Sequence, residues 1–181
     1  MFGRGCIKEE IIPFETMSSE KVTVGRFTVV EDQVQVRGHK QPYDYLEIRE
    51  GVSILPIHDG KVVVLRQYRY PVRSWQWEVP GGFVDKGETP AEAVARELKE
   101  ETGYDVKEIV SLGAFYPSFG STNEKIHLFM AVCGMKGEDA REPGEVLSVT
   151  EVTFDEFREL VRSGEFMHGA GLAAWARYCE R

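Results

Sequence analysis

The chain has 181 residues, of which 42% are hydrophobic, and this size suits one domain of ordinary size with a buried core and a small additional element. Its formal net charge of −8 argues against a nucleic-acid partner, because the phosphate backbone attracts basic surfaces. No apolar run approaches the ~18 residues of a membrane span. The three scattered cysteines, Cys6, Cys133 and Cys179, predict a reduced, cytoplasmic protein.

The first fifty residues predict an N-terminal arm followed by a small antiparallel sheet. Residues 1–20 are mixed in character and are expected to form the arm. Alternating apolar and polar side chains predict strands over residues 22–30, 34–37 and 43–50. These segments have few residues to bury their own face, so the sheet is expected to pack on the main domain or on a second subunit.

Residues 51–181 predict the main domain. An apolar strand over residues 52–57 is followed by an Asp-Gly turn and a returning strand over residues 61–67. The next stretch, residues 66–71 (RQYRYP), could hold phosphate and stack on a base, or could be a surface strand with paired arginines. Trp75 and Trp77 then suggest an aromatic wall, with core packing as the alternative for one of the two.

The stretch from Gly81 to Tyr104 predicts a glycine-rich loop that leads into a helix. Thr89 is suited to the N-cap, Pro90 to the first helical position, and Glu92 to the closing position of a capping box. Gly103 is a matching helix end. The residues expected to face the core lie on one arc of the helix: Ala91, Val94, Ala95, Leu98 and Thr102.

Glu97, Glu100 and Glu101 share a different arc, about 100° wide at 3.6 residues per turn. Glu97 and Glu101 form a like-charge pair four residues apart, which destabilises an isolated helix. Three acids that converge on one face favour a cation, and an all-oxygen site suits Mg²⁺ or Mn²⁺. The alternative is a solvated acidic face, but the glycine-rich loop that feeds the helix argues for a site.

The remainder of the chain predicts strands over residues 108–116, 124–133 and 146–154, and helices over residues 155–163 and 169–180. A polar loop covers residues 134–144. The order of these elements along the chain is strands, a helix, more strands and then two helices. This order predicts an α/β or α+β sandwich, with a mixed sheet between helices.

The spacing Gly82, Glu88, then Arg-Glu-Leu-x-Glu-Glu-x-Gly over residues 96–103 resembles the signature of the Nudix hydrolase family. It departs from that signature only at Tyr104, where an aliphatic residue is more usual. The resemblance implies the Nudix fold, an α/β/α sandwich, and metal-dependent hydrolysis of a nucleoside diphosphate linked to another group. A small-molecule nucleoside diphosphate derivative is therefore the expected partner.

The same resemblance implies roles for the signature residues. Glu97 and Glu101 correspond to metal ligands, and the backbone carbonyl of Gly81 completes the site. Glu100 corresponds to a third ligand or a partner of metal-bound water. Arg96 corresponds to the residue that orients the acids, while Glu88 braces the loop.

Features outside the signature resemble the ADP-ribose pyrophosphatase branch, which also contains nucleotide-sugar hydrolases. Three of them are sequence segments: RQYRYP, the following WEVPGG, and FYPSFGSTNEKIHLFMA. The fourth is the N-terminal sheet, which proteins of that branch often share across a homodimer. The resemblance implies that Arg69 contacts phosphate and Glu124 faces the substrate. ADP-ribose would be cleaved to AMP and ribose 5-phosphate. Three further residues in these segments are also expected to bind substrate: Glu78, Trp77 and Phe119.

Two departures from the branch bear on substrate and mechanism. Phe119 stands where a proline marks ADP-ribose specificity, and Pro143 stands where ADP-ribose enzymes often place the general base. The base is then Glu142 or Glu145, with Glu124 or a signature glutamate as further candidates. The alternatives are a pyrophosphatase for UDP-glucose or GDP-mannose, a sensor that binds a nucleotide without cleaving it and, less favoured, cleavage of damaged nucleoside triphosphates.

Overall fold

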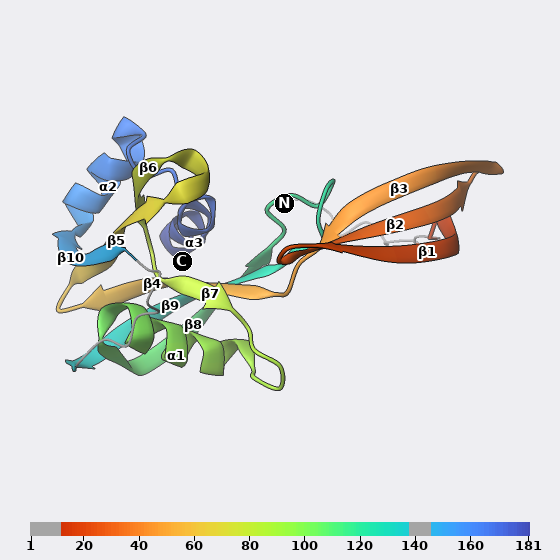
Figure 1. The fold of residues 1–181 in the computed structure, drawn as a ribbon. Helices are drawn as coiled ribbons and strands as arrows, with labels where there is room; N and C mark the ends of the chain where they lie inside the picture. Colours follow the sequence, from red (N-terminus) through yellow and green to blue (C-terminus); the bar gives the residue numbers. More distant parts are fainter. Residues whose placement is uncertain (1–11, 138–145) are drawn as a thin grey trace, which may run out of the picture. The chain divides into compact units, whose positions relative to one another are not determined.

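The computed structural model describes residues 12–137 and 146–181, which form two units (Figure 1). The first unit contains the described residues up to Ile48 together with the loop Ser118–Asn123. The second unit contains Arg49–Pro117 and the described residues from Glu124 to Arg181. Within the described ranges, no helix is both long enough and apolar enough to cross a membrane.

The N-terminal unit is a three-stranded antiparallel sheet, as predicted, with β1 (Phe14–Val24), β2 (Phe27–Val36) and β3 (His39–Glu47) in that order. The predicted strand bounds were wrong. The expected strand over residues 22–30 contains the turn between β1 and β2, where Gly25 has φ +60°. A left-handed residue reverses the chain there, so one apolar alternation belongs to two paired strands.

The loop Ser118–Asn123 is attached to the end of β3 by three hydrogen bonds. The backbone amide of Leu46 donates to the carbonyl of Ser121 (2.9 Å), and the amide of Asn123 donates back to Leu46 (3.3 Å). The side chain of Asn123 accepts from the amide of Ile48 (2.7 Å). A loop that is distant in sequence therefore belongs to the N-terminal unit.

The second unit is built on a mixed sheet in the order β10-β5-β4-β9-β8, with β6 paired to β5 and β7 paired to β4. The pair β4 and β9 is parallel, and the other pairs are antiparallel. The sequence did not predict β6 and β7, which are short and lie in the approach to the helix. The strands are β4 (Gly51–His58), β5 (Lys61–Arg69), β6 (Ser74–Glu78), β7 (Gly81–Phe83), β8 (Tyr104–Phe115), β9 (Ile126–Lys136) and β10 (Leu147–Thr153).

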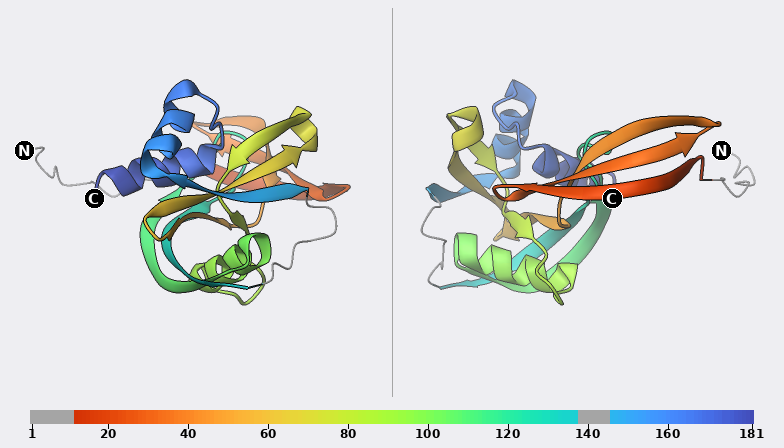
Figure 2. Two further views of the ribbon diagram at one scale, coloured as in Figure 1. Left: turned by 90° about the vertical axis from the view of Figure 1, so that its left-hand side faces the viewer. Right: turned by 45° about the vertical axis from the view of Figure 1, so that its right-hand side comes forward.

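Helices cover both faces of this sheet (Figure 2). Helix α1 (Pro90–Thr102) packs on one face with Ile54, while α2 (Phe154–Ser163) and α3 (Gly169–Cys179) pack on the other with Leu55. Adjacent residues of β4 thus enter different cores, as the two-residue period of a strand requires. The predicted α/β/α sandwich with a mixed sheet is confirmed.

Candidate active site

Helix α1 begins and ends where the sequence predicts. The Thr89 hydroxyl accepts from the amide of Glu92 (3.3 Å), and the Glu92 carboxylate accepts from the amide of Thr89 (2.7 Å), which completes the capping box. Pro90 opens the helix, and Gly103 ends it with φ +79°. The helix therefore presents its acidic residues from a fixed start.

The buried face of α1 differs from the predicted arc. Ala91 and Ala95 are exposed, whereas Ala93 and Glu101 are buried together with the expected Val94, Leu98 and Thr102. The reason is the contact with the glycine loop: Glu101 is only 4% exposed, and its Oε2 accepts a hydrogen bond from the amide of Gly81 (2.9 Å). The acidic edge of the helix is therefore part of the packed face.

The glycines of β7 allow the helix and the loop to approach closely. A β-carbon on Gly82 would lie 2.1 Å from Oε1 of Glu97, and one on Gly81 would lie 2.3 Å from the carbonyl oxygen of Val52. Since real β-carbons do not approach other atoms so closely, only glycine fits at either position without a shift. The Glu97 carboxylate is thereby set against the loop backbone.

Arg96 binds the acids and the loop through one guanidinium group. Its Nε and Nη2 donate to the carboxylate of Glu88 (2.9 and 3.0 Å), and Nη2 also donates to the carbonyl of Phe83 (2.9 Å). Its Nη1 donates to Glu97 (2.7 Å) and Glu100 (3.1 Å). Hydrogen bonds from Arg96, and then from the amide of Asp85, lower the pKa of Glu88.

The chemistry of the donors in this region fits a hard divalent cation. Glu97 and Glu101 place carboxylates beside the glycine loop, the amide of Gly81 in that loop contacts Glu101, and Glu100 lies at the more exposed edge. The space against Gly82 that holds the Glu97 carboxylate has no room for a side chain. In the part of the chain that the structure describes, no three acidic, histidine or cysteine side chains already surround one point at ligand distance.

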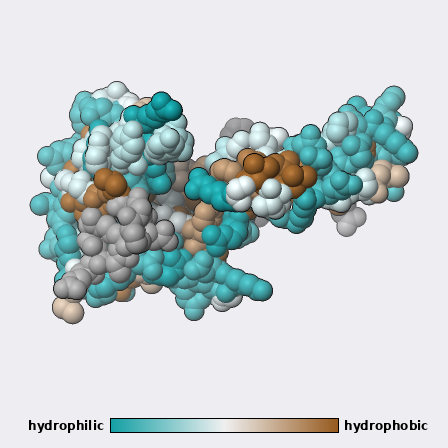
Figure 3. Space-filling view, viewed as in Figure 1, coloured by the Kyte–Doolittle hydropathy of each residue, from teal (hydrophilic) through white to brown (hydrophobic). Residues whose placement is uncertain are grey.

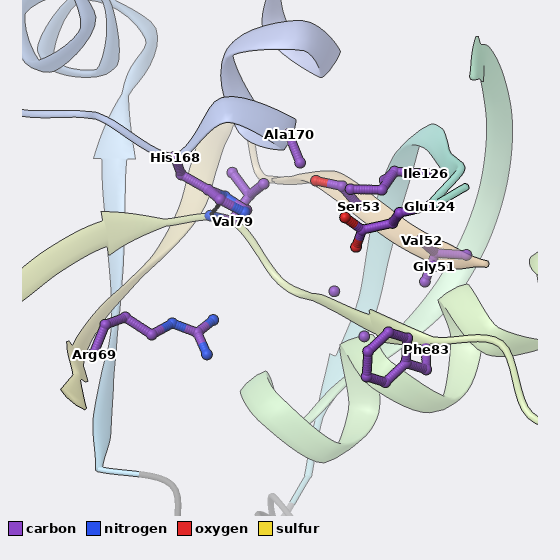
Figure 4. Close-up of a pocket in the computed structure, with 12 residues that line it drawn as sticks. Gly51, Val52, Ser53, Arg69, Val79, Phe83, Glu124, Ile126, His168 and Ala170 are labelled. Carbon is purple, nitrogen blue, oxygen red and sulfur yellow. Dashed lines mark hydrogen bonds between the residues drawn. The ribbon is translucent and has the colours of Figure 1, made fainter. Parts of the chain in front are cut away.

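A cavity of about 300 Å³ lies beside these residues, within the second unit (Figure 4). Arg69 reaches it from β5 and is held by Glu78, whose buried carboxylate accepts from Nε at 2.8 and 3.1 Å. Glu124 lines the same cavity, and burial raises the pKa of its carboxyl group. Arg69 and Glu124 therefore place a cation and a carboxylate on the lining of one open cavity.

The structure describes two further predicted site residues, Trp77 and Phe119. Trp77 packs against the core under α2 and α3, with the Arg66 guanidinium 5.0 Å from its ring centre, and is not part of the cavity lining. Phe119 is 82% exposed and belongs to the N-terminal unit. Glu142 and Glu145 fall outside the described residues, so the assignment of the general base stays a prediction.

Sequence reasoning missed two polar residues that line the cavity. Ser53 lies on β4, and His168 precedes α3, where its Nδ1 accepts from the amide of Val79 (3.3 Å). Burial lowers the pKa of His168. Neither residue belongs to a motif that could be recognised in the sequence. They come together only in the folded chain, where β4 lies next to the start of α3.

The chain is similar to several known proteins. The family model described as the NUDIX domain matches residues 47–169. The ADP-ribose pyrophosphatase of Bacillus subtilis (strain 168) is 33% identical over 83% of this chain and 84% of its own length. The GDP-mannose pyrophosphatase of Salmonella paratyphi B is 31% identical over 74% of each chain. The crystal structure of an ADP compounds hydrolase has a TM-score of 0.84 at 24% identity, covers 96% of both chains, and shows the same fold.

Proposed function

The chain belongs to the Nudix family, and on this premise we propose that it hydrolyses the pyrophosphate bond of a nucleotide sugar, with ADP-ribose as the first candidate. The products would be AMP and ribose 5-phosphate. The observation that carries the proposal is the contact of α1 with the glycine loop, where Glu97 and Glu101 lie against Gly82 and Gly81. The relative from Bacillus subtilis, named an ADP-ribose pyrophosphatase, supports the choice of substrate.

The proposed ligands for Mg²⁺ or Mn²⁺ are Glu97, Glu100, Glu101 and the carbonyl of Gly81. When bound there, the cation would neutralise the clustered negative charge of the pyrophosphate. Arg96 holds two of these acids, and its contact with Phe83 fixes the loop that carries the carbonyl. The pre-set positions of these groups reduce the reorganisation needed during the reaction.

Arg69 is proposed to hold the phosphates from the opposite side of the cavity. Its ion pair with the buried Glu78 fixes the direction of the guanidinium group. A carboxylate must also accept a proton from the attacking water. We assign this role to Glu142 or Glu145, and keep Glu100 and Glu124 as candidates.

The test is a panel of substrates with Mg²⁺ or Mn²⁺: ADP-ribose, UDP-glucose, GDP-mannose and nucleoside triphosphates. A coupled phosphatase reports release of phosphate esters. Selective cleavage of ADP-ribose supports the proposal and shows that Phe119 and Pro143 are tolerated. Cleavage of another nucleotide sugar in its place means that these positions mark a changed pocket.

A pyrophosphatase for GDP-mannose is the second candidate, supported by the relative from Salmonella paratyphi B that carries this name. The same panel separates the two candidates. If the protein binds nucleotides but cleaves neither ADP-ribose nor GDP-mannose, it would be a nucleotide sensor rather than an enzyme. The intact set of acids on α1 argues for catalysis rather than sensing.

We also propose that the N-terminal sheet forms a homodimer. All eleven residues of β1 are exposed, and apolar side chains such as Phe14, Val24 and Phe27 are at least 43% exposed. Figure 3 shows a hydrophobic patch on this sheet. Exposed apolar patches of this kind often mark interfaces. Light scattering tests the proposal, and a monomer at micromolar concentration would contradict it.

A further inference from the structure

The N-terminus of α3 opens on the cavity without a side-chain cap. His168 occupies the N-cap position, but its side chain makes no cap hydrogen bond, since Nδ1 accepts from the amide of Val79. Ala170, in the first turn, lines the cavity. Amides in a first helical turn have no partner within the helix, and they attract oxygen acceptors.

Ser53 presents a second donor at the same place. It is 1% exposed, and among the described residues its Oγ has no hydrogen-bond partner. A buried hydroxyl without a partner is uncommon in a native structure and calls for an explanation such as a ligand. Figure 4 shows Ser53 and Ala170 along one side of the cavity, with Arg69 on the opposite side.

Glu124 adds an acceptor to this group of donors. Its carboxylate lines the cavity beside Ser53 in Figure 4. A phosphate placed between these groups would be repelled by the carboxylate. A sugar hydroxyl can donate to a carboxylate such as Glu124 and accept from Ser53 or from a helix amide, so its chemistry matches these donors and this acceptor.

We propose that Ser53 and the N-terminus of α3 bind the hydroxyl groups of the sugar moiety of the substrate. This inference rests on the proposed function, because it identifies the part of a nucleotide sugar that enters the cavity. The volume of about 300 Å³ is at the low end for ligand pockets. It suits the sugar moiety of the substrate rather than the whole nucleotide sugar. Ser53 then determines specificity for the sugar, while the acids of α1 act on the pyrophosphate.

The test compares Ser53→Ala with the wild type in hydrolysis and in product binding. We expect kcat/KM for ADP-ribose to fall about tenfold or more, since a group that binds a substrate hydroxyl is lost. Calorimetry should show weaker binding of ribose 5-phosphate by a similar factor and unchanged binding of AMP. The melting temperature should not fall, because Ser53 Oγ has no partner among the described residues. Ser148→Ala, an exposed serine of β10, is the control.

A second pair of variants tests the helix amide. Proline is tolerated in the first turn of a helix, so Ala170→Pro removes one amide, and Ala170→Val controls for size. Weaker binding of ribose 5-phosphate by Ala170→Pro than by Ala170→Val is expected. If Ser53→Ala and Ala170→Pro both bind ribose 5-phosphate as the wild type does, the inference is overturned. If the wild type cleaves no nucleotide sugar, the proposed function fails, and the binding data still decide the inference.

Discussion

The carboxylate of Glu97 occupies the space that a β-carbon on Gly82 would need, 2.1 Å from its Oε1. This relationship joins two parts of the signature that are separated by the turn before α1. It explains in physical terms why a glycine precedes an acidic helix at this distance. The glycine is there to let a carboxylate reach the backbone.

Replacement of Gly82 by alanine should therefore impair the metal site more than the fold. The methyl group would meet the end of a flexible side chain, so Glu97 can move away with little loss of stability. We expect metal affinity to fall by about 10–100-fold, as it does when groups that orient ligands are removed. Titration with Mn²⁺ measures this, with the melting temperature as a control.

Gly81→Ala provides the contrast to this variant. Its β-carbon would lie 2.3 Å from the backbone oxygen of Val52, which cannot move aside. A large loss of stability is expected, of about 2 kcal/mol or more, because the sheet itself must shift. Equal stability of Gly81→Ala and Gly82→Ala would contradict this reading of the loop.

Arg96→Lys should lower activity although it keeps the positive charge. Lysine cannot reproduce the planar fork that contacts Glu88, Glu97, Glu100 and Phe83. We expect kcat/KM to fall by about tenfold or more, with weaker metal binding. Arg158→Lys, on the exposed side of α2, is the control and should behave as the wild type. Wild-type kinetics in Arg96→Lys would show that the fork has no role.

Much of this architecture could be predicted from the sequence, because local signals determine it. The capping box at Thr89 and the glycine at position 103 correctly predict the first and last residues of α1. The two-residue alternation predicted the sheet but not the turn at Gly25 that divides β1 from β2. The orientation of α1 was predicted less well, because the burial of Glu101 depends on its bond to Gly81.

The sequence pointed to two residues that line the cavity, but not to the cavity itself. Arg69 and Glu124 were identified through the resemblance, and both line the cavity. Ser53 and His168 have no pattern of their own, since the sheet and α3 bring them together only in the folded chain. Trp77 was assigned to substrate binding, but it packs against the core under α2 and α3 and does not line this cavity.

Glu124→Gln should raise stability at neutral pH. Burial raises the pKa of Glu124 above the ordinary value of 4.5, so the folded state binds its proton more tightly than the unfolded state does. The wild type therefore loses stability as the pH rises from the unfolded value through the folded value. Below the unfolded value the two proteins should be equally stable, and above the folded value the variant should be more stable.

Denaturant unfolding between pH 4 and pH 8 measures this difference. A constant difference between Glu124→Gln and the wild type across this range would count against a titration effect. Hydrolysis of ADP-ribose should fall in the variant above the folded-state pKa of Glu124, because an amide there replaces a carboxylate, which is the stronger acceptor for a substrate hydroxyl. Loss of activity with gain of stability is a common pattern at binding sites.

Arg69→Met should destabilise the protein, because it leaves the buried carboxylate of Glu78 without its partner. The expected loss is about 1–3 kcal/mol, reduced from the value for a fully buried pair because Arg69 is 48% exposed. The double variant Arg69→Met with Glu78→Gln should recover part of the stability but not the activity. Unfolding in urea and ADP-ribose kinetics measure both effects. Equal stability of the single and double variants would mean that the ion pair is unimportant.

The central claim is that the acids of α1 support hydrolysis of a nucleotide sugar. The most direct measurement follows AMP release from ADP-ribose with Mg²⁺, for the wild type and Glu101→Gln, with ADP-ribose binding measured in parallel by calorimetry. We predict equal amounts of AMP and ribose 5-phosphate from the wild type. Release by the variant should be at least about a hundredfold slower, with binding retained. Binding without release by the wild type, or wild-type release by Glu101→Gln, would contradict the account.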